Sequence, residues 1–162
     1  MGFKKRETET DLLNERRIID NLVIDYFDGR KFRKWKDYGA GDYISDPDEM
    51  ILIEIKCLDY DRYKSGGEYR FPVVYLEFGK FVKMLYFAKD HPKAAYFCPC
   101  FRDESLIIRI DFDFLERYKV HKFKRKDRDE SYIVMEIRSD DFKIMGETPR
   151  LLQSENWRRK NG

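Results

Sequence analysis

The chain carries the stretch DYISDPDEMILIEIK at residues 42–56, and this stretch predicts a β-hairpin. A short strand opens with Asp42, the polar run Asp46–Glu49 supplies a turn, and a strongly apolar strand returns. Successive side chains of a strand point to opposite faces, so Glu54 and Lys56 share one face while the isoleucines between them share the other. We therefore expect one face of the hairpin to be core and the other face to carry charge.

The charged face of this hairpin predicts a metal site. Folding the hairpin about its turn brings Asp42 within about one or two residues of Glu54 across the strand pair. Two carboxylates in this position suit Mg²⁺, with Mn²⁺ as a possible substitute, because such ions keep several waters and accept phosphate oxygens as further ligands. Lys56 can then lower the pKa of an attacking water or stabilise charge on the phosphorus oxygens. We expect Asp42 and Glu54 to be metal ligands and Lys56 to be catalytic.

An aspartate followed by Glu-x-Lys on the next strand, here Asp42, Glu54 and Lys56, resembles the PD-(D/E)XK nuclease superfamily. That superfamily includes restriction endonucleases and archaeal Holliday junction resolvases. The resemblance implies an α/β (α+β) fold with a restriction-endonuclease-like core, in which helices flank a central mixed β-sheet in the order α-β-β-α-β-β. Residues 7–111 can be read in that order, which is about two thirds of the chain.

The chain departs from the family pattern at the first motif. Its Pro47-Asp48 pair lies in the turn, only six residues before Glu54, whereas Asp42 has the better reach across the hairpin. We therefore place the metal-ligand role on Asp42. The resemblance implies a metal-dependent DNA endonuclease that hydrolyses phosphodiester bonds.

Two alternatives stay open beside the nuclease. The first is a catalytically silent nuclease-like fold that binds nucleic acid or another protein. The second is an unrelated α+β interaction module, because an aspartate followed by Glu-x-Lys also arises by chance in half-exposed sheets.

The first helix is expected within residues 8–27, where apolar residues recur at helical spacing. Glu15 falls in the same row as Leu12 and Ile19, so it lies on or beside the packing stripe. In the resembling family a helix carboxylate often completes the metal site, which makes Glu15 a catalytic candidate. Equally, Glu15 can be an edge residue that pairs with Arg16 or with a lysine of a neighbouring strand.

Basic residues in three places are candidates for contacts with DNA. Cations interleaved with aromatic residues precede the hairpin and suit a phosphate backbone and an exposed base, although an amphipathic segment with solvated cations explains the same pattern. A second basic cluster lies near residue 124. In the resembling family the helix after Glu-x-Lys often places a basic residue near the site. The candidates are Arg30, Lys31, Arg33 and Lys34 before the hairpin, Lys80 in the following helix, and Lys122, Lys124, Arg125 and Lys126 in the second cluster.

The remaining elements are expected within one domain that covers residues 1–162. Its core is expected at about residues 7–115, followed by a C-terminal extension at about 116–162. Apolar spacing and alternation predict a helix over 73–88 and strands over 94–98, 106–112 and 131–138.

The composition of the chain indicates which kinds of partner and which cellular compartment to expect. Charged residues make up 40% of the chain but balance to a formal +2, so no global excess of positive charge indicates a polyanion partner. No apolar run approaches the roughly 18 residues of a membrane-spanning helix, and we expect no membrane partner. The odd count of three cysteines favours a reducing compartment, so we expect an intracellular protein, cytoplasmic or nucleoid-associated. We expect DNA as partner, whether duplex, branched or single-stranded, and a homodimer is plausible because family members commonly dimerise.

Other chemistries lack their motifs in the sequence. Cys98 and Cys100 have one residue between them, which is tighter than the spacing of structural zinc sites. Gly66-Gly67 is not followed by the Gly-Lys-Ser/Thr of a nucleoside triphosphatase, and no Gly-x-Ser-x-Gly sequence supports acyl transfer.

Overall fold

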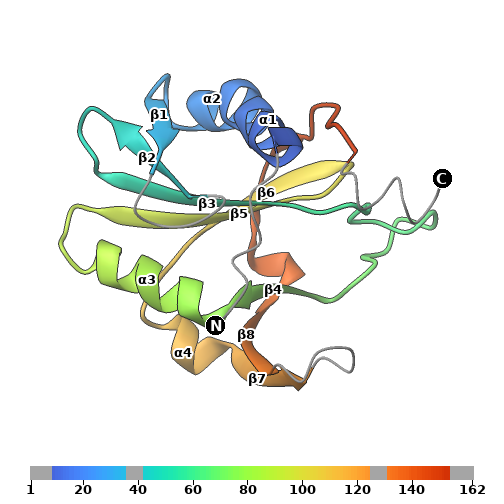
Figure 1. The fold of residues 1–162 in the computed structure, drawn as a ribbon. Coiled ribbons are helices and arrows are strands. Elements are labelled where there is room, and N and C mark those ends of the chain that lie inside the picture. Colours follow the sequence, from blue (N-terminus) through green and yellow to red (C-terminus); the bar gives the residue numbers. More distant parts are fainter. Residues whose placement is uncertain (1–8, 36–41, 125–130, 154–162) are drawn as a thin grey trace.

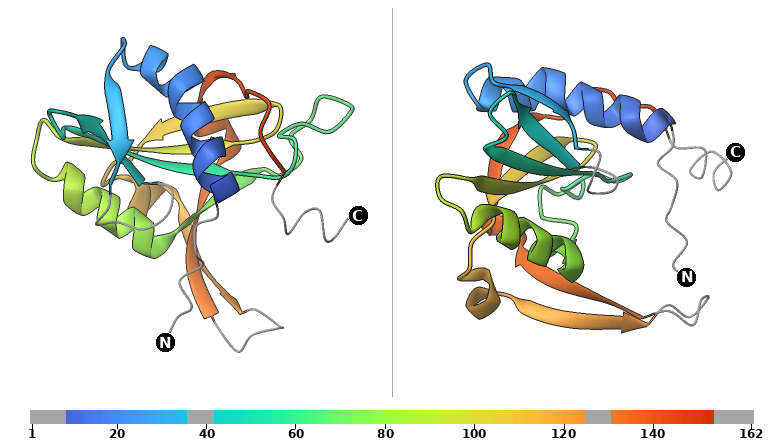
Figure 2. Two further views of the ribbon diagram at one scale, coloured as in Figure 1. Left: turned by 45° about the horizontal axis from the view of Figure 1, so that its top comes forward. Right: turned by 60° about the vertical axis from the view of Figure 1, so that its left-hand side comes forward.

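The computed structural model describes residues 9–35, 42–124 and 131–153 of the chain. A six-stranded mixed sheet forms the middle layer, and the N-terminal helical segment covers one of its faces (Figure 1). Helix α3 and a three-stranded sheet cover the other face (Figure 2). The structure therefore confirms the expected α/β class with a mixed sheet flanked by helices.

The elements follow one another along the chain as a helical segment, a strand meander, a helix between two strands, and a strand-rich C-terminal third. They are α1 (Glu9–Ile18), the π-helical turn η1 (Ile19–Val23), α2 (Ile24–Tyr26), β1 (Lys31–Lys34), β2 (Asp42–Asp46), β3 (Ile51–Cys57), β4 (Val73–Glu77), α3 (Phe78–Ala88), β5 (Ala94–Cys100), β6 (Glu104–Arg109), α4 (Phe114–Arg117), β7 (Lys119–Lys124), β8 (Ser131–Arg138), the 3₁₀ turn η2 (Ser139–Asp141) and β9 (Lys143–Glu147).

The large sheet has the strand order β1-β2-β3-β5-β6-β9. Strands β3 and β5 are parallel, and every other neighbouring pair of this sheet is antiparallel. Parallel neighbours need a crossover connection, and the chain supplies it through β4 and α3. The small sheet has the antiparallel order β4-β8-β7.

Strand β3 is buried on both faces, and its two faces belong to different cores. Ile53 and Ile55 pack in the core beneath α1 and η1. Leu52 packs in the second core together with Phe81 of α3. Glu54 lies two residues after Leu52, so its side chain points toward the layer that holds α3. The expected alternation along β3 is therefore confirmed, but its charged face is covered by protein at Glu54.

The segment expected as one helix over residues 73–88 divides into strand β4 and helix α3. Val73, Val74 and Tyr75 are residue types that favour strands, and β4 pairs with β8, a partner about 60 residues away that local spacing does not reveal. Strand β1 was also not expected, whereas helical structure from Glu9 to Tyr26 matches the expected first helix.

The strands expected from alternation appear close to their expected bounds, as β5, β6 and β8. Strands β8 and β9 fall within the expected C-terminal extension, yet β8 pairs with β4 and β9 pairs with β6 at the edge of the large sheet. The C-terminal third therefore contributes to both sheets of the fold.

Candidate active site

The hairpin of β2 and β3 places two carboxyl groups side by side. Asp42 lies directly opposite Glu54 in the antiparallel register, so the two side chains point to the same face of the sheet. Asp42 is fully buried and Glu54 is 1% exposed. The register therefore brings together the two residues expected to be metal ligands.

The turn of this hairpin explains why Asp42 and not Asp48 faces Glu54. The buried hydroxyl oxygen of Ser45 accepts hydrogen bonds from the backbone N–H groups of Met50 and Ile51, both at 3.0 Å. The same hydroxyl donates to Asp48 Oδ1 at 2.5 Å, and this hydrogen bond is the main cause that lowers the pKa of Asp48. Asp48 thus stabilises the turn, at the opposite end of the hairpin from Glu54.

Helix α3 supplies two lysines to the carboxyl pair. The ammonium group of Lys80 donates to Glu54 Oε1, and that of Lys83 donates to Asp42 Oδ2. Residues three apart lie on the same helix face, so one face of α3 aligns both ammonium groups with the hairpin. The candidate Lys80 therefore reaches the expected site. Lys83 was not among the expected site residues, although its spacing from Lys80 was a usable signal.

Each carboxyl group keeps one buried oxygen without a hydrogen-bond partner among the described residues. These oxygens are Asp42 Oδ1 and Glu54 Oε2. Burial raises the pKa of Glu54 well above its ordinary value, and a hydrogen bond with the neighbouring Asp42 carboxyl and repulsion from its charge raise it further, while Lys80 opposes the shift. A buried carboxylate oxygen without a donor is costly. A proton shared by the two carboxyl groups, or a cation between them, would remove that cost.

Lys56 extends the same strand face beyond Glu54. Because side chains alternate along a strand, the Lys56 side chain lies on the same face of β3 as that of Glu54, and Lys56 is exposed. The protein packed around the ammonium group nevertheless lowers the pKa of Lys56, and repulsion from Lys80 lowers it further, against attraction from Glu54 and Glu77. Lys56 therefore lies within electrostatic range of Glu54.

Glu15 lies on the other side of the sheet. It belongs to the helical segment in which Ile18 and Ile19 pack against Ile53 and Ile55. This segment therefore covers the face of β3 opposite to the one that carries Glu54. The carboxylate of Glu15 is buried and pairs with Lys34 Nζ of β1 at 3.2 Å. The structure does not bring Glu15 to the carboxyl pair, and its pairing with a strand lysine is the alternative that the sequence left open.

The first basic cluster is largely engaged in ion pairs. Arg30 pairs with Asp48. Arg33 pairs with Glu49 at 3.1 Å and with Asp46 at 3.7 Å. Together with the contact between Lys34 and Glu15, these pairs brace β1 against the hairpin and α1. Lys31 is exposed on the same strand.

The second basic cluster lies on strand β7. Lys122 and Lys124 are exposed there. Arg125 and Lys126 fall outside the described residues. Figure 2 shows β7 and β8 extending below α3, away from the helical segment at the N-terminus.

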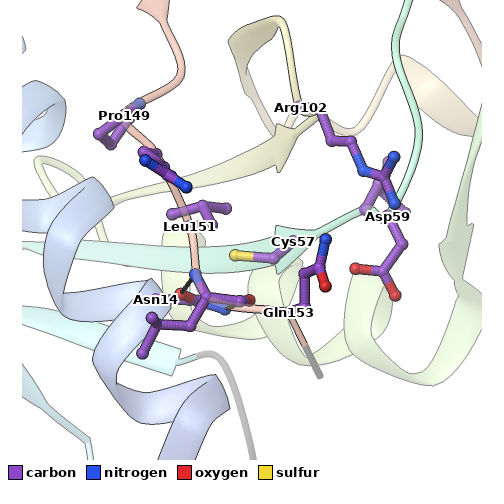
Figure 3. A pocket seen from close by; sticks show the side chains of 10 residues that line it. Asn14, Cys57, Asp59, Arg102, Pro149, Leu151 and Gln153 are labelled. Carbon is purple, nitrogen blue, oxygen red and sulfur yellow. Dashed lines mark hydrogen bonds between the residues drawn. The ribbon is translucent and has the colours of Figure 1, made fainter. Parts of the chain in front are cut away.

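A separate pocket of about 270 Å³ lies at the C-terminal end of β3, on the side of α1 (Figure 3). The side-chain amide of Asn14 joins its two walls, since it donates to Leu152 O at 2.8 Å and accepts from Leu152 N at 2.7 Å. Burial is the main cause that raises the pKa of the Cys57 thiol, so this cysteine is a poor nucleophile. The lining residues are Asn14, Cys57, Leu58, Asp59, Arg102, Pro149, Arg150, Leu151, Leu152 and Gln153.

Within the described ranges, no group of three or more His, Cys, Asp or Glu side chains is arranged to hold a metal ion. Asp42 and Glu54 are therefore a pair, and water or phosphate oxygens would have to complete the coordination of a metal. In the same ranges, no helix has both the length and the apolar character needed to cross a membrane.

Comparison of the chain with known proteins found no matching family model, no matching curated protein and no matching solved structure. The case for a function therefore depends on the geometry around Asp42 and Glu54.

Proposed function

We propose that this protein is a magnesium-dependent nuclease that hydrolyses phosphodiester bonds of DNA at the Asp42–Glu54 pair. The single observation that carries the proposal is the pair of buried oxygens, Asp42 Oδ1 and Glu54 Oε2, which lack a donor among the described residues when both carboxyl groups are ionised and which lie on directly opposed residues. Lys56 follows on the same strand face. This arrangement unites two hard anionic ligands and a cation, which are the groups that phosphodiester hydrolysis needs.

The chemistry of the donor set fits Mg²⁺. Magnesium is commonly bound through one or two carboxylates and keeps several of its waters, so a pair of carboxylates is a sufficient protein contribution. Asp42 and Glu54 would hold the ion through the oxygens that have no donor among the described residues. When bound, the ion would polarise a phosphate oxygen and lower the pKa of a coordinated water.

Each residue of the site has its own part in the hydrolysis. The β2–β3 ladder fixes the backbone positions of Asp42 and Glu54, so their carboxyl groups would hold the metal ion at a fixed place in the site. Lys56 follows Glu54 on the same strand face, and its ammonium group would stabilise the negative charge that grows on the phosphorus oxygens as water attacks. The attacking water gives up one proton to solvent as its oxygen bonds to phosphorus, the bond from phosphorus to the leaving oxygen breaks, and the leaving oxygen takes up one proton from solvent.

The order of helices and strands agrees with the superfamily that the sequence resembles, and this agreement supports the proposal. A helix precedes the hairpin, and α3 followed by β5 and β6 comes after it, as the PD-(D/E)XK superfamily implies. Strands β1 and β4 are additions to the expected order. The parallel pairing of β5 with β3 requires the crossover that carries α3, and α3 brings Lys80 and Lys83 to the site.

A second candidate function is a nuclease-like fold that binds nucleic acid or protein without cutting. The observation that favours it is that Lys80 and Lys83 already neutralise the carboxyl pair. A site of this kind would have no need for a metal ion, since two internal cations balance two carboxylates.

A cleavage assay separates these two functions. The purified protein is incubated with supercoiled plasmid, single-stranded DNA and a four-way junction, each in Mg²⁺, in Mn²⁺ and in EDTA. The nuclease proposal expects cleavage of at least one substrate with metal, none in EDTA, and loss of cleavage in Glu54→Gln. A metal-independent binding module would retain the DNA uncut under all three conditions.

A further inference from the structure

We propose that Lys80 and Lys83 are internal counter-cations that a divalent metal displaces from the carboxyl groups of Asp42 and Glu54. This inference rests on the proposed function, since it concerns the same carboxyl pair. It gives α3 a role in metal binding, whereas the sequence motif places the site residues on the hairpin.

The ion pairs show how closely the lysines occupy the site. Each lysine contacts a different carboxyl group, so Glu54 Oε1 and Asp42 Oδ2 are taken and the other two oxygens are left without a donor among the described residues. A metal ion held by those remaining oxygens would lie next to both ammonium groups. Like charges at such separations repel strongly where little water screens them.

Charge balance gives the direction of the exchange. When both carboxyl groups are ionised, the positive charges of Lys80 and Lys83 offset the negative charges of Asp42 and Glu54. A divalent ion supplies the same charge at one point, so metal and lysines together leave the site with an excess of positive charge. Departure of the ammonium groups, or arrival of a phosphate, removes that excess.

Lys80 and Lys83 can leave the carboxyl groups by a change of side-chain rotamer while helix α3 stays in place. The side chains of Lys80 and Lys83 are 35% and 22% exposed, so part of each flexible side chain reaches solvent. In contrast, Phe81 and Met84 on the same helix are fully buried and hold α3 against the sheet. A change of lysine rotamers is therefore enough to open the site.

Metal affinity provides the first test, and Lys83→Met is the informative variant. Binding of Mn²⁺ is measured by isothermal titration calorimetry for the wild type, Lys83→Met and Lys89→Met. We expect about tenfold tighter binding in Lys83→Met, which corresponds to removal of about 1.4 kcal/mol of competition. Lys89 follows the last residue of α3, and its ammonium group lies over the Tyr86 ring, so Lys89→Met removes the same charge without touching the carboxyl pair and should change affinity less than about twofold.

Lysine reactivity in the wild type provides a second test that needs no variant. Acetic anhydride is added with and without Mn²⁺, and acetylation at each lysine is measured by mass spectrometry. We expect labelling of Lys80 and Lys83 to rise severalfold with Mn²⁺, because contact with a buried carboxylate shields each ammonium group from the reagent. Labelling of Lys89 should not change.

The results distinguish a failure of the proposed lysine exchange from a failure of the proposed nuclease function. If the wild type binds Mn²⁺ but neither the affinity of Lys83→Met nor the labelling changes, the exchange is wrong and the metal site stands. If neither the wild type nor Lys83→Met binds Mn²⁺, the proposed function fails and the exchange fails with it. Binding in Lys83→Met alone would also overturn the exchange, since it shows that the metal does not displace the lysine from the wild-type site.

Discussion

Asp42 and Glu54 are directly opposed across the β2–β3 ladder, and both carboxyl groups are buried. Such a pair is unfavourable unless protons or cations compensate it. Lys80 and Lys83 compensate two of its four oxygens, and the other two have no donor among the described residues. Stability and activity should therefore both respond to protons and cations at this pair.

Glu54→Gln should remove a pH dependence of stability. The pKa of Glu54 is raised above its ordinary value of 4.5, chiefly by burial, so the folded protein binds a proton that the unfolded chain releases. The stabilising contribution is full below about pH 4.5 and is lost as the pH rises through the raised folded pKa. The free energy of unfolding of the wild type should therefore fall relative to that of Glu54→Gln as the pH rises.

The measurement is urea denaturation of both proteins between about pH 5 and 8, with the difference between them as the readout. Taking the difference cancels groups such as Asp48 and Asp141, whose pKa values are lowered and whose contributions are common to both proteins. A difference that stays constant with pH would show that Glu54 is ionised throughout.

Lys56→Ala should lose turnover and keep metal affinity. The proposed charge of Lys56 acts on the transition state, so its removal should lower kcat by about 100-fold, the scale of losing one electrostatic stabiliser. Affinity for Mn²⁺ should not fall, because Lys56 is a cation near Glu54 and not a ligand, and affinity for DNA in Ca²⁺ should be largely kept. Cleavage rates in Mg²⁺ are compared with DNA binding in Ca²⁺, and equal losses of rate and DNA affinity would place Lys56 in substrate binding instead.

The two basic clusters should differ in their effect on DNA binding. Arg30 and Arg33 already pair with carboxylates of the hairpin, so their exchange for glutamine should change the salt dependence little. Exchange of Lys122 and Lys124 for glutamine should lower the slope of log affinity against log salt by about 0.9 for each duplex phosphate that is no longer neutralised. The slopes come from fluorescence anisotropy in Ca²⁺. The opposite ranking would move the DNA-binding surface to β1.

Arg62→Met should destabilise the fold. The Arg62 guanidinium is buried, pairs with Glu104 at 2.7 Å and donates to Ser139 O at 2.9 Å. Removal of the cation leaves these acceptors without their donor, which costs about 3 kcal/mol for a buried ion pair. Arg70 is exposed on the same loop, and Arg70→Met should change stability by less than about 0.5 kcal/mol. Similar values for both variants, measured by urea denaturation, would contradict a structural role for Arg62.

The hairpin was predictable from sequence because its determinants are local. Alternation in β3 and the polar turn fix which residues face one another, and the register of Asp42 with Glu54 follows. The choice of Asp42 over Asp48 also followed from reach along the strand. The lysine spacing on α3 was visible, but its alignment with the carboxyl pair depends on how α3 packs.

Other features depend on partners distant in sequence. Strand β4 looks helical because its apolar residues continue the spacing of α3, and only pairing with β8 makes it a strand. Glu15 lies on the stripe that packs against the sheet, but the face of the sheet covered by α1 is set by the whole topology. Arg62 lies in a polar loop whose sequence suggests a solvated segment, whereas its burial against Ser139 requires the C-terminal third of the chain.

The most direct test of the central claim compares two aspartates of one hairpin. Nicking of supercoiled plasmid in Mg²⁺ is measured for the wild type, Asp42→Asn and Asp48→Asn, with EDTA as the metal-free control. We expect the wild type and Asp48→Asn to cut at similar rates in Mg²⁺ only, because Asp48 bonds to Ser45 and Arg30 in the turn. Asp42→Asn should lose cleavage by at least about 100-fold. Undiminished cleavage by Asp42→Asn, or no metal-dependent cleavage by the wild type, would contradict a nuclease site at Asp42 and Glu54.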